Sequence, residues 1–199
     1  MVAENYYYKP STRQLRAWLQ SRLVGKLRSV NVRKVLSEPS PGWKAGCGAL
    51  LEGGIHFVAL MNDLAGGVPK GVVARFPGHE PKTQERHAVV DVAYDNGVTG
   101  NLEYSIKTPS MAGGVFQHSS LEGDRGTIVF ESNGLYALRA EWGLRGVWPF
   151  PLEDLTGYAA MAEDFLGLLE EPARPPYSDY TKAKQALHVV FDAYRQLPG

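Results

Sequence analysis

The sequence predicts an α+β fold in which a large, open and mostly antiparallel sheet carries helices packed on one face. Three observations predict it. Apolar residues recur at helical spacing near both ends of the chain. Between residues 68 and 140 they alternate with polar residues at a period of two, and short turn sequences join the alternating runs, which favours antiparallel neighbours. The 199 residues, 44% of them apolar, suffice for one core, so residues 1–199 are expected to form a single domain.

The first part of the chain is expected to form a helix, a strand and a second helix. The first helix should begin at Ser11, because Ser11 and Gln14 have the spacing of a capping box, and Gly25 is placed to end it. The valine-rich residues 26–36 then alternate as in a strand. A glycine-rich stretch, residues 46–54, leads into the second helix, which should end before two further glycines.

Six short runs with a period of two follow, and they are expected to be strands of the sheet. They cover residues 71–76, 86–94, 97–107, 115–121, 127–130 and 134–139. Asp95-Asn96-Gly97, between the second and third runs, is a strong signal for a tight hairpin. In the third run Leu102 and Tyr104 alternate with polar residues, so one face of the sheet should be apolar and the other polar. The open polar face is expected to be an interface.

Two helices are expected to close the chain. In the first, over residues 154–170, apolar side chains form a broad stripe, and Pro172 follows it. Ser178 is the expected N-cap of the second helix, which repeats the stripe as far as Tyr194. With apolar stripes of this kind, the helices should cover one face of the sheet.

The composition argues against several classes of function. Twenty-one basic residues balance 21 acidic ones, so net charge gives no reason to expect a nucleic acid or a membrane surface as a partner. We find neither a run of about 18 apolar residues nor a secretory leader, so a cytoplasmic location is expected. The lone Cys47 should be either a small buried residue or a reactive thiol. His79, His87 and His118 lack the spacing of a metal site, so no metal is expected.

A carboxylate and an imidazole with acid–base spacing lie in the glycine-rich stretch. Glu52 precedes His56 by four residues, so in a helix both side chains lie on one face about one turn apart. A glutamate beside a histidine raises the imidazole pKa and fixes its tautomer, as proton exchange with an alcohol requires. The alternative is an ordinary helix pair. The glycines favour a site, because their number suggests that another group approaches this backbone closely.

Four motifs occur in a fixed order along the chain. They are Glu4-Asn5-Tyr6 through Tyr8-Lys9-Pro10, the stretch Gly48-Ala49-Leu50-Leu51-Glu52-Gly53-Gly54-Ile55-His56, the turn Gly123-Asp124-Arg125-Gly126-Thr127-Ile128, and Arg174-Pro175-Pro176 before an amphipathic helix. Together they resemble the C-terminal domain of the glucose-fructose oxidoreductase, inositol dehydrogenase and MocA group of NAD(P)-dependent sugar and polyol dehydrogenases. The stretch that ends at His56 is the most specific match, and the resemblance covers nearly the whole chain.

The resemblance implies catalytic roles for two residues of the glycine-rich stretch. His56 would relay the proton, and Glu52 would bind or orient a sugar or polyol substrate, together with a lysine from the preceding nucleotide-binding domain. The sequence departs from the family pattern at two positions, since aspartate is more common where Glu52 stands and frequent where Ala59 stands. The extra methylene would move the carboxylate by about 1.5 Å, a displacement that can matter greatly to rate.

The same resemblance implies that the cofactor is bound outside this chain. No G-x-G-x-x-G follows a strand, and no glutamate-lysine-proline motif supplies the catalytic lysine. No cofactor-binding residue is therefore expected here. NAD or NADP would be held by a missing N-terminal Rossmann domain or subunit, and the isolated chain is expected to be inactive. Family members pair through their sheets, which implies a homo-oligomer.

Five further residues are candidates for contact with the sugar substrate. They are Trp43, Arg75, His87, His118 and Arg125, and each is otherwise a solvated strand or loop position. Two functions of different class therefore remain. The chain is either the substrate-binding and catalytic-histidine domain of an NAD(P)-dependent sugar or polyol oxidoreductase, or a non-enzymatic assembly or ligand-binding module derived from that domain. The intact histidine favours the first function, and the missing cofactor domain favours the second.

Overall fold

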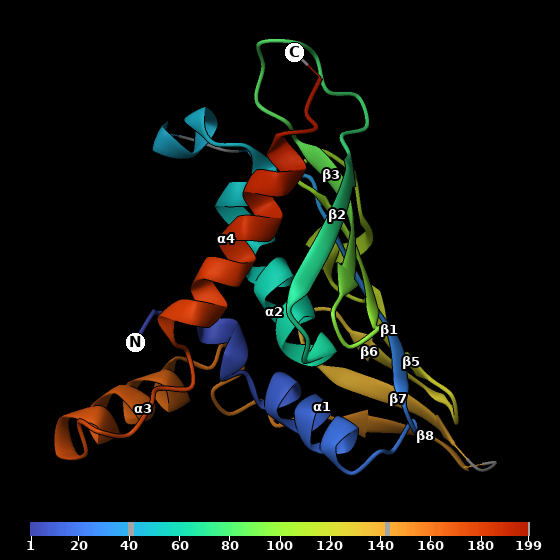
Figure 1. Cartoon of the computed structure of the whole chain (residues 1–199). Coiled ribbons are helices and arrows are strands. Elements are labelled where there is room, and N and C mark those ends of the chain that lie inside the picture. Colours follow the sequence, from blue (N-terminus) through green and yellow to red (C-terminus); the bar gives the residue numbers. More distant parts are fainter. Residues whose placement is uncertain (40–41, 142–143, 199) are drawn as a thin grey trace.

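Eight strands form one open sheet within residues 1–39, 42–141 and 144–198, the part of the chain that this computed structural model describes (Figure 1). The strands are β1 (Leu27–Val35), β2 (Pro69–Arg75), β3 (His87–Tyr94), β4 (Thr99–Ser105), β5 (His118–Gly123), β6 (Thr127–Glu131), β7 (Tyr136–Glu141) and β8 (Leu144–Pro149). Their order is β2-β3-β4-β1-β5-β6-β7-β8, and every neighbouring pair is antiparallel except β1 with β4. The predicted large, open and mostly antiparallel sheet is confirmed.

β1 lies in the middle of the sheet. The meander β2-β3-β4 flanks it on one side, and the meander β5-β6-β7-β8 flanks it on the other. Local turns close these meanders, as between β3 and β4, where Gly97 has a φ of 82°, in the left-handed region. No turn joins β1 directly to β4, so the turn signals of the sequence could not reveal their parallel pairing.

The helices cover one face of the sheet, as predicted for an α+β fold. The α-helices are α1 (Pro10–Gln20), α2 (Ile55–Ala65), α3 (Tyr158–Glu170) and α4 (Tyr180–Tyr194). The shorter helices are η1 (Asn5–Tyr7), η2 (Gly42–Gly46), η3 (Leu50–Gly54) and η4 (Met111–Gly114). Figure 1 shows α1, α2 and α4 on one side of the sheet, whereas α3 projects away from it. α2 packs directly on β1 and β4, and α4 packs on α2 and β2.

α2 is the central helix of the core. Eight of its eleven residues are buried, because the sheet, α1 and α4 surround it. Met61 lies against Gly100 of β4, where an added Cβ would stand 2.7 Å from the Met61 sulfur. The sheet contributes the fully buried Val30, Leu102 and Leu121. α2 is therefore fixed closely against the middle strands, and the residues at its start are held by the same packing.

Two helix starts differ from the prediction by one residue. α1 begins at Pro10, after Lys9, and not at a capping box on Ser11, because proline suits the first helical position. α4 is capped by Asp179 and not by Ser178. The Asp179 carboxylate accepts a hydrogen bond of 2.8 Å from a backbone N–H in the first turn of α4.

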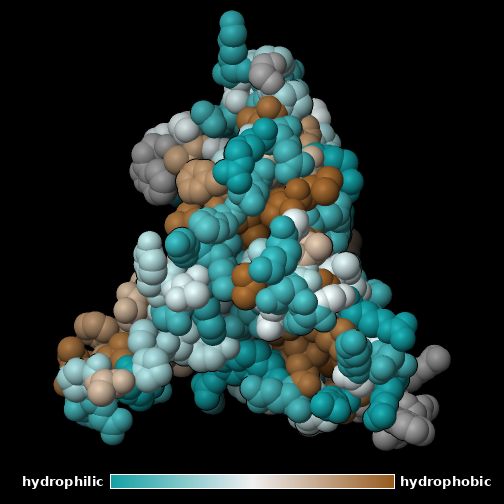
Figure 2. All heavy atoms as spheres, viewed as in Figure 1, coloured by the Kyte–Doolittle hydropathy of each residue, from teal (hydrophilic) through white to brown (hydrophobic). Residues whose placement is uncertain are grey.

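The apolar stripe of α3 does not pack on the sheet, contrary to the prediction. α3, which the structure describes along its whole length, has no buried residue, and Phe165 and Leu169 are 50% and 64% exposed. Figure 2 shows apolar side chains gathered at the lower left, over α3. Polar contacts hold the helix instead, since Asp164 accepts a hydrogen bond of 2.6 Å from the Tyr8 hydroxyl and pairs with Arg174 at 2.7 Å. The stripe is left open to a partner.

One row of side chains crosses the open face of the sheet and all eight described strands. In register order it consists of Val73, Asp91, Asn101, Asn31, Ser120, Val129, Leu138 and Val147. The middle of the row is polar, because Asn101 donates to Asp91 at 2.5 Å and Asn31 donates to Ser120 at 3.1 Å. The end of the row on β6, β7 and β8 is apolar, and Val147 is 68% exposed.

Candidate functional site

The glycine-rich stretch begins the central helix, and its first turn is a π-helix. η3 runs directly into α2 and brings the chain to His56. Such turns are rare in proteins and are frequent at functional sites. Gly53 and Gly54 lie against the ring of Tyr104 in β4, and a Cβ added at Gly53 would meet the Tyr104 hydroxyl. The close approach that the glycines predict is therefore made by the protein's own sheet.

Two side chains from distant parts of the sequence bind the first N–H groups of this helix. The carboxylate of Glu85, just before β3, accepts hydrogen bonds of 2.5 and 2.7 Å from Ala49 and Leu50. The Tyr194 hydroxyl donates to Glu85 at 2.7 Å and accepts from the Leu51 N–H at 3.0 Å. Burial raises the pKa of Glu85, and these hydrogen bonds oppose that rise. We refer to Glu85 and Tyr194 as the helix cap.

His56 is held by a carboxylate from the start of the chain. Its Nδ1 lies 2.8 Å from one Glu4 carboxylate oxygen and 3.1 Å from the other. Its ring stacks on Tyr6, with the ring centroids 5.2 Å apart and the planes inclined by 11°. The side chain is 39% exposed, and Nε2 has no hydrogen-bond partner among the described residues. One ring nitrogen is thus oriented by Glu4, and the other is available to a substrate.

Glu52 does not bind His56 directly. Its carboxylate pairs with the Lys44 ammonium of η2 at 2.6 Å and is largely buried. The predicted effect of a glutamate on the imidazole does occur, but Glu4 causes most of it. The hydrogen bond from Glu4 raises the pKa of His56 above the usual 6.5, burial lowers it, and the charges of Glu4 and Glu52 add to the rise. The charge of Lys9 opposes the rise.

Lys9 lies close to the same site. Its ammonium is 4.5 Å from the centroid of the Tyr6 ring, the ring on which His56 stacks. Burial lowers the pKa of Lys9 to about 8, and the nearby charge of Glu131 limits the fall. Tyr6 therefore contacts both an imidazole and a buried ammonium, so the start of the chain supplies three groups to the surroundings of His56.

Replacing Glu4 with glutamine is expected to lower the pKa of His56, because the neutral amide cannot stabilise the imidazolium. A proton NMR titration of the His56 ring measures this pKa. Glu52→Gln is the matched control, and it should lower the pKa less, since Glu52 acts on His56 only through its charge. An equal fall of the His56 pKa in the two variants would contradict the conclusion that Glu4 is the main cause of the raised pKa.

The pairing of His56 with Glu4 stabilises the fold, and this stabilisation depends on pH in a known direction. The pKa of His56 is higher in the folded chain than the usual 6.5, so the stabilisation is complete below about pH 6.5 and is lost as the pH rises through the folded value. The difference in free energy of unfolding between the wild type and Glu4→Gln should therefore shrink as the pH is raised through this range.

The structure does not bring four of the five sugar-contact candidates to His56. Arg75 pairs with Asp91 at 3.0 Å on the open face of the sheet, and His87 Nε2 lies 3.3 Å from Glu103 on the same face. His118 hydrogen bonds Tyr136 at 2.8 Å and lines a hollow of about 260 Å³ there. The core separates this face from α2, so one small substrate cannot touch both.

Of the remaining two candidates, Arg125 is also apart from His56. Arg125 lies in the turn between β5 and β6, where its N–H donates to the Val24 carbonyl at 3.0 Å. Trp43 has its backbone in η2, the short helix that also carries Lys44, and its side chain lies outside the described part of the structure. Of the two, Trp43 is nearer in sequence to the residues around Glu52.

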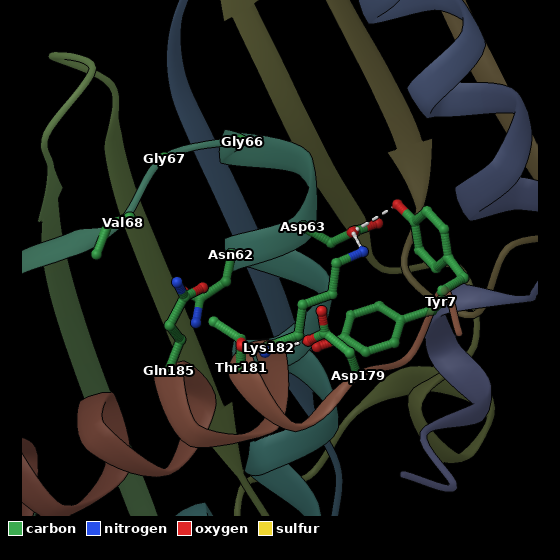
Figure 3. Close-up of a pocket in the computed structure, with 11 residues that line it drawn as sticks. Tyr7, Asn62, Asp63, Gly66, Gly67, Val68, Asp179, Thr181, Lys182 and Gln185 are labelled. Atoms are coloured by element: carbon green, nitrogen blue, oxygen red, sulfur yellow. Dashed lines mark hydrogen bonds and ion pairs between the residues drawn. The ribbon is translucent and has the colours of Figure 1, made fainter. Parts of the chain in front are cut away.

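A larger pocket, of about 420 Å³, lies at the other end of α2 (Figure 3). Asp63 and Lys182 meet at its edge, 3.1 Å apart, and Asp63 also accepts hydrogen bonds of 2.8 Å from Arg16 and Tyr177. The charged groups here already pair with one another. Asp63 follows His56 by seven residues, about 10 Å along a helix, so the pocket is separate from the His56 site.

The glycine-rich start of this helix does not fit the diphosphate of a nicotinamide dinucleotide. Dinucleotide-binding folds place the pyrophosphate at a helix N-terminus that follows a glycine-rich loop. Here the N–H groups that follow Gly46 and Gly48 are already taken by the Glu85 carboxylate and Tyr194. A buried carboxylate at that position would repel a diphosphate.

Within the described ranges, no group of three or more His, Cys, Asp or Glu side chains is placed to hold a metal ion. None of the described helices has the length and apolar character needed to cross a membrane.

Solved structures of oxidoreductases share this fold. An oxidoreductase from Agrobacterium radiobacter in complex with NAD+, L-tartaric acid and magnesium superimposes with a TM-score of 0.82 and 17% identity, over 98% of this chain and 61% of that one. An aldose-aldose oxidoreductase from Caulobacter crescentus complexed with glycerol gives a TM-score of 0.82 and 15% identity, over 98% and 60%. UDP-N-acetylglucosamine 3-dehydrogenase GnnA from Acidithiobacillus ferrooxidans gives 0.77 and 17%, also over 98% and 60%. This chain spans about three fifths of each.

The sequence comparisons agree with the fold. No curated protein matches the chain. The sequence pattern of the GFO/IDH/MocA C-terminal domain matches residues 12–129, more than half of the chain, including the glycine-rich stretch and the first five strands. The chain therefore belongs to the GFO/IDH/MocA family and corresponds to its C-terminal domain.

Proposed function

We propose that this chain is the substrate-binding and proton-handling domain of an NAD(P)-dependent sugar or polyol oxidoreductase. The observation that carries the proposal is His56, whose Nδ1 is fixed by Glu4 while Nε2 stays available. The nicotinamide cofactor, which takes up hydride in this class of enzyme, would be bound by a separate Rossmann domain or subunit. The names of the similar structures, which include a sugar-nucleotide dehydrogenase and complexes with glycerol and L-tartaric acid, support a hydroxylated substrate.

Oxidation of an alcohol to a carbonyl releases the hydroxyl proton. In the proposed site His56 Nε2 accepts that proton, and Glu4 stabilises the imidazolium that forms. The raised pKa of His56 supports this role, because it makes the imidazole a stronger proton acceptor than an ordinary histidine. Glu52, fixed by Lys44, is placed one turn away to orient a second substrate hydroxyl. The test of the proposal is NAD(P)-dependent turnover by the complete enzyme with and without the His56 imidazole.

We also propose that the open stripe of α3 contacts the nucleotide-binding domain. Tyr158, Leu166 and Leu169 of α3 are more than half exposed, and such a large apolar surface is unusual on a free-standing domain. α3 is joined to the start of the chain by the hydrogen bond from Tyr8 to Asp164. A domain docked on α3 would therefore also lie near the residues that surround His56.

A second candidate function, assembly of copies of this chain, is favoured by the apolar end of the row on the sheet. We propose that Val129, Leu138 and Val147 pack against a second copy, with the polar middle of the row at its centre. Replacing both Leu138 and Val147 with glutamate should weaken dimerisation at least about 100-fold, because two apolar contacts are exchanged for charges. Sedimentation analysis measures the dissociation constant.

Leu169→Glu, which changes an exposed leucine on α3, away from the sheet, is the matched control and should leave dimerisation unchanged. A wild-type chain that stays monomeric at high concentration would refute the interface. Dimers that persist when Glu52 and His56 are replaced, together with the absence of any activity that depends on these two side chains, would support the non-enzymatic function over the first proposal.

A further inference from the structure

The helix that carries Glu52 and His56 is fixed at its start from outside. Glu85 is only 1% exposed, and among the described residues its carboxylate accepts hydrogen bonds from the N–H groups of the first helical turn and from the Tyr194 hydroxyl. Its backbone carbonyl also accepts from the Ala49 N–H, at 3.0 Å. Tyr194 completes the cap from the last turn of α4. An ordinary N-cap uses a side chain at the helix start itself, whereas this one joins three separate parts of the chain.

The helix cap leaves no room for a side chain at position 48, just before the helix. A Cβ added at Gly48 would stand 2.5 Å from the Tyr194 oxygen and 2.6 Å from the Glu85 carboxyl carbon. Real Cβ atoms do not approach other heavy atoms so closely, so the glycine permits the contact between cap and backbone. The close packing at Gly48 and the buried Glu85 carboxylate together hold the first turn of η3 in a single position.

The π-turn lies between the cap and the reactive histidine. η3 begins at Leu50, which donates to Glu85, and ends two residues before His56. A π-turn and an α-turn differ in how many residues they hold, so a change from one to the other rotates every side chain that follows. The direction of His56 toward Glu4, and of Glu52 toward Lys44, therefore depends on the register of this turn.

We propose that Glu85 and Tyr194 are positioning residues for the His56 site, which fix the register of the π-turn so that His56 meets Glu4. The effect of these residues on turnover rests on the proposed function, whereas their effect on the orientation of His56 does not. Neither residue would touch substrate. They act through the backbone of residues 49–51, which precede His56 by five to seven residues.

The first arm of the test measures the pKa of His56 by NMR in the present chain. Tyr194→Phe removes one oxygen from the cap, and it is expected to lower the pKa of His56 by at least half of the fall that Glu4→Gln produces. Tyr94→Phe is the matched control. Its hydroxyl donates to Asn62 at 2.7 Å, on the same helix but at the opposite end. The control should lower the melting temperature and leave the pKa of His56 unchanged.

The second arm uses the complete enzyme. Tyr194→Phe should lower kcat about 10-fold with little change in KM, since the substrate still binds but its proton acceptor is displaced. Glu85→Gln, which keeps the shape of the cap and removes its charge, should have the same effect on the His56 pKa and on kcat. If Glu85→Gln does not fold, Tyr194→Phe decides the question alone.

The outcomes separate the two proposals. A folded Tyr194→Phe variant with an unchanged pKa of His56 would overturn the positioning role, whatever the enzyme does. A lowered pKa in this variant, together with turnover that does not depend on His56, would uphold the positioning role and refute the proposed function. An equal fall of the pKa in Tyr94→Phe would show only a general loosening of α2 and would also overturn the proposal.

Discussion

Replacing His56 with alanine is expected to lower the kcat of the complete enzyme by about 10²–10⁴-fold, the usual contribution of a general acid–base group. The proton released by the alcohol would have no acceptor at this position, whereas Glu4 and Glu52 would remain in place. Steady-state rates with NAD(P) and a panel of sugars and polyols measure the loss. KM should change little, because the imidazole is assigned to the proton and not to substrate affinity.

The fold should tolerate this change, since the His56 side chain is partly exposed and its ring packs mainly on Tyr6. His188→Ala is the matched control, because His188 is an exposed histidine on α4. It should leave both kcat and the melting temperature unchanged. A His56→Ala enzyme with a normal rate would remove the basis of the proposed function and favour the assembly module.

Replacing Gly53 with alanine is expected to destabilise the chain by about 1–3 kcal/mol, the usual cost of overpacking a filled core. The added Cβ would meet the hydroxyl of Tyr104, which is held in the sheet beneath η3. Either the π-turn or the tyrosine must move, so the variant should lose catalytic rate as well as stability. Thermal unfolding and kcat are measured on the same preparation.

The double variant Gly53→Ala with Tyr104→Phe tests the cause of that loss. Removing the hydroxyl makes room for the new methyl group, so the second change should restore much of the stability and rate lost in the first. Tyr104→Phe alone should cost little, because the ring and its contact with Phe57 remain. If the two changes are simply additive, the clash with the hydroxyl is not the reason for glycine at this position.

Local signals in the sequence were enough to predict most of the secondary structure. Gly66 ends α2 with a φ of 67°, and the hairpin before β4 forms where Asn96-Gly97 predicts it. β8 is absent from the prediction, because Gly146 and Pro149 interrupt its alternation and β8 is itself an edge strand, which pairs only with β7. α3 was misjudged for another reason. Its stripe is real, but the surface that would cover it is not in the described part of the chain.

The site was predictable only where its residues are neighbours in sequence. The spacing of Glu52 and His56 correctly marks the helix turn on which both lie, but spacing cannot show that Lys44 takes the Glu52 carboxylate. Glu4, 52 residues before His56, gives no periodic signal, although it opens the first motif of the family resemblance. Glu85 and Tyr194 are also distant in sequence, 35 and 143 residues from Leu50 and Leu51, and their role depends on a π-turn that no apolar pattern specifies.

The central place of β1 has a consequence for how the chain folds. β1 precedes the other strands in the sequence, yet its contacts lie far along the chain, with Glu103 of β4 separated from Arg33 by 70 residues and Ser120 of β5 separated from Asn31 by 89. The two meanders can form from local hairpins, but neither gives a complete sheet until both have closed on this one strand. Closing such long loops is slow. Until β4 and β5 have both paired with it, β1 has an unpaired edge, so the folding chain is exposed to aggregation at this strand.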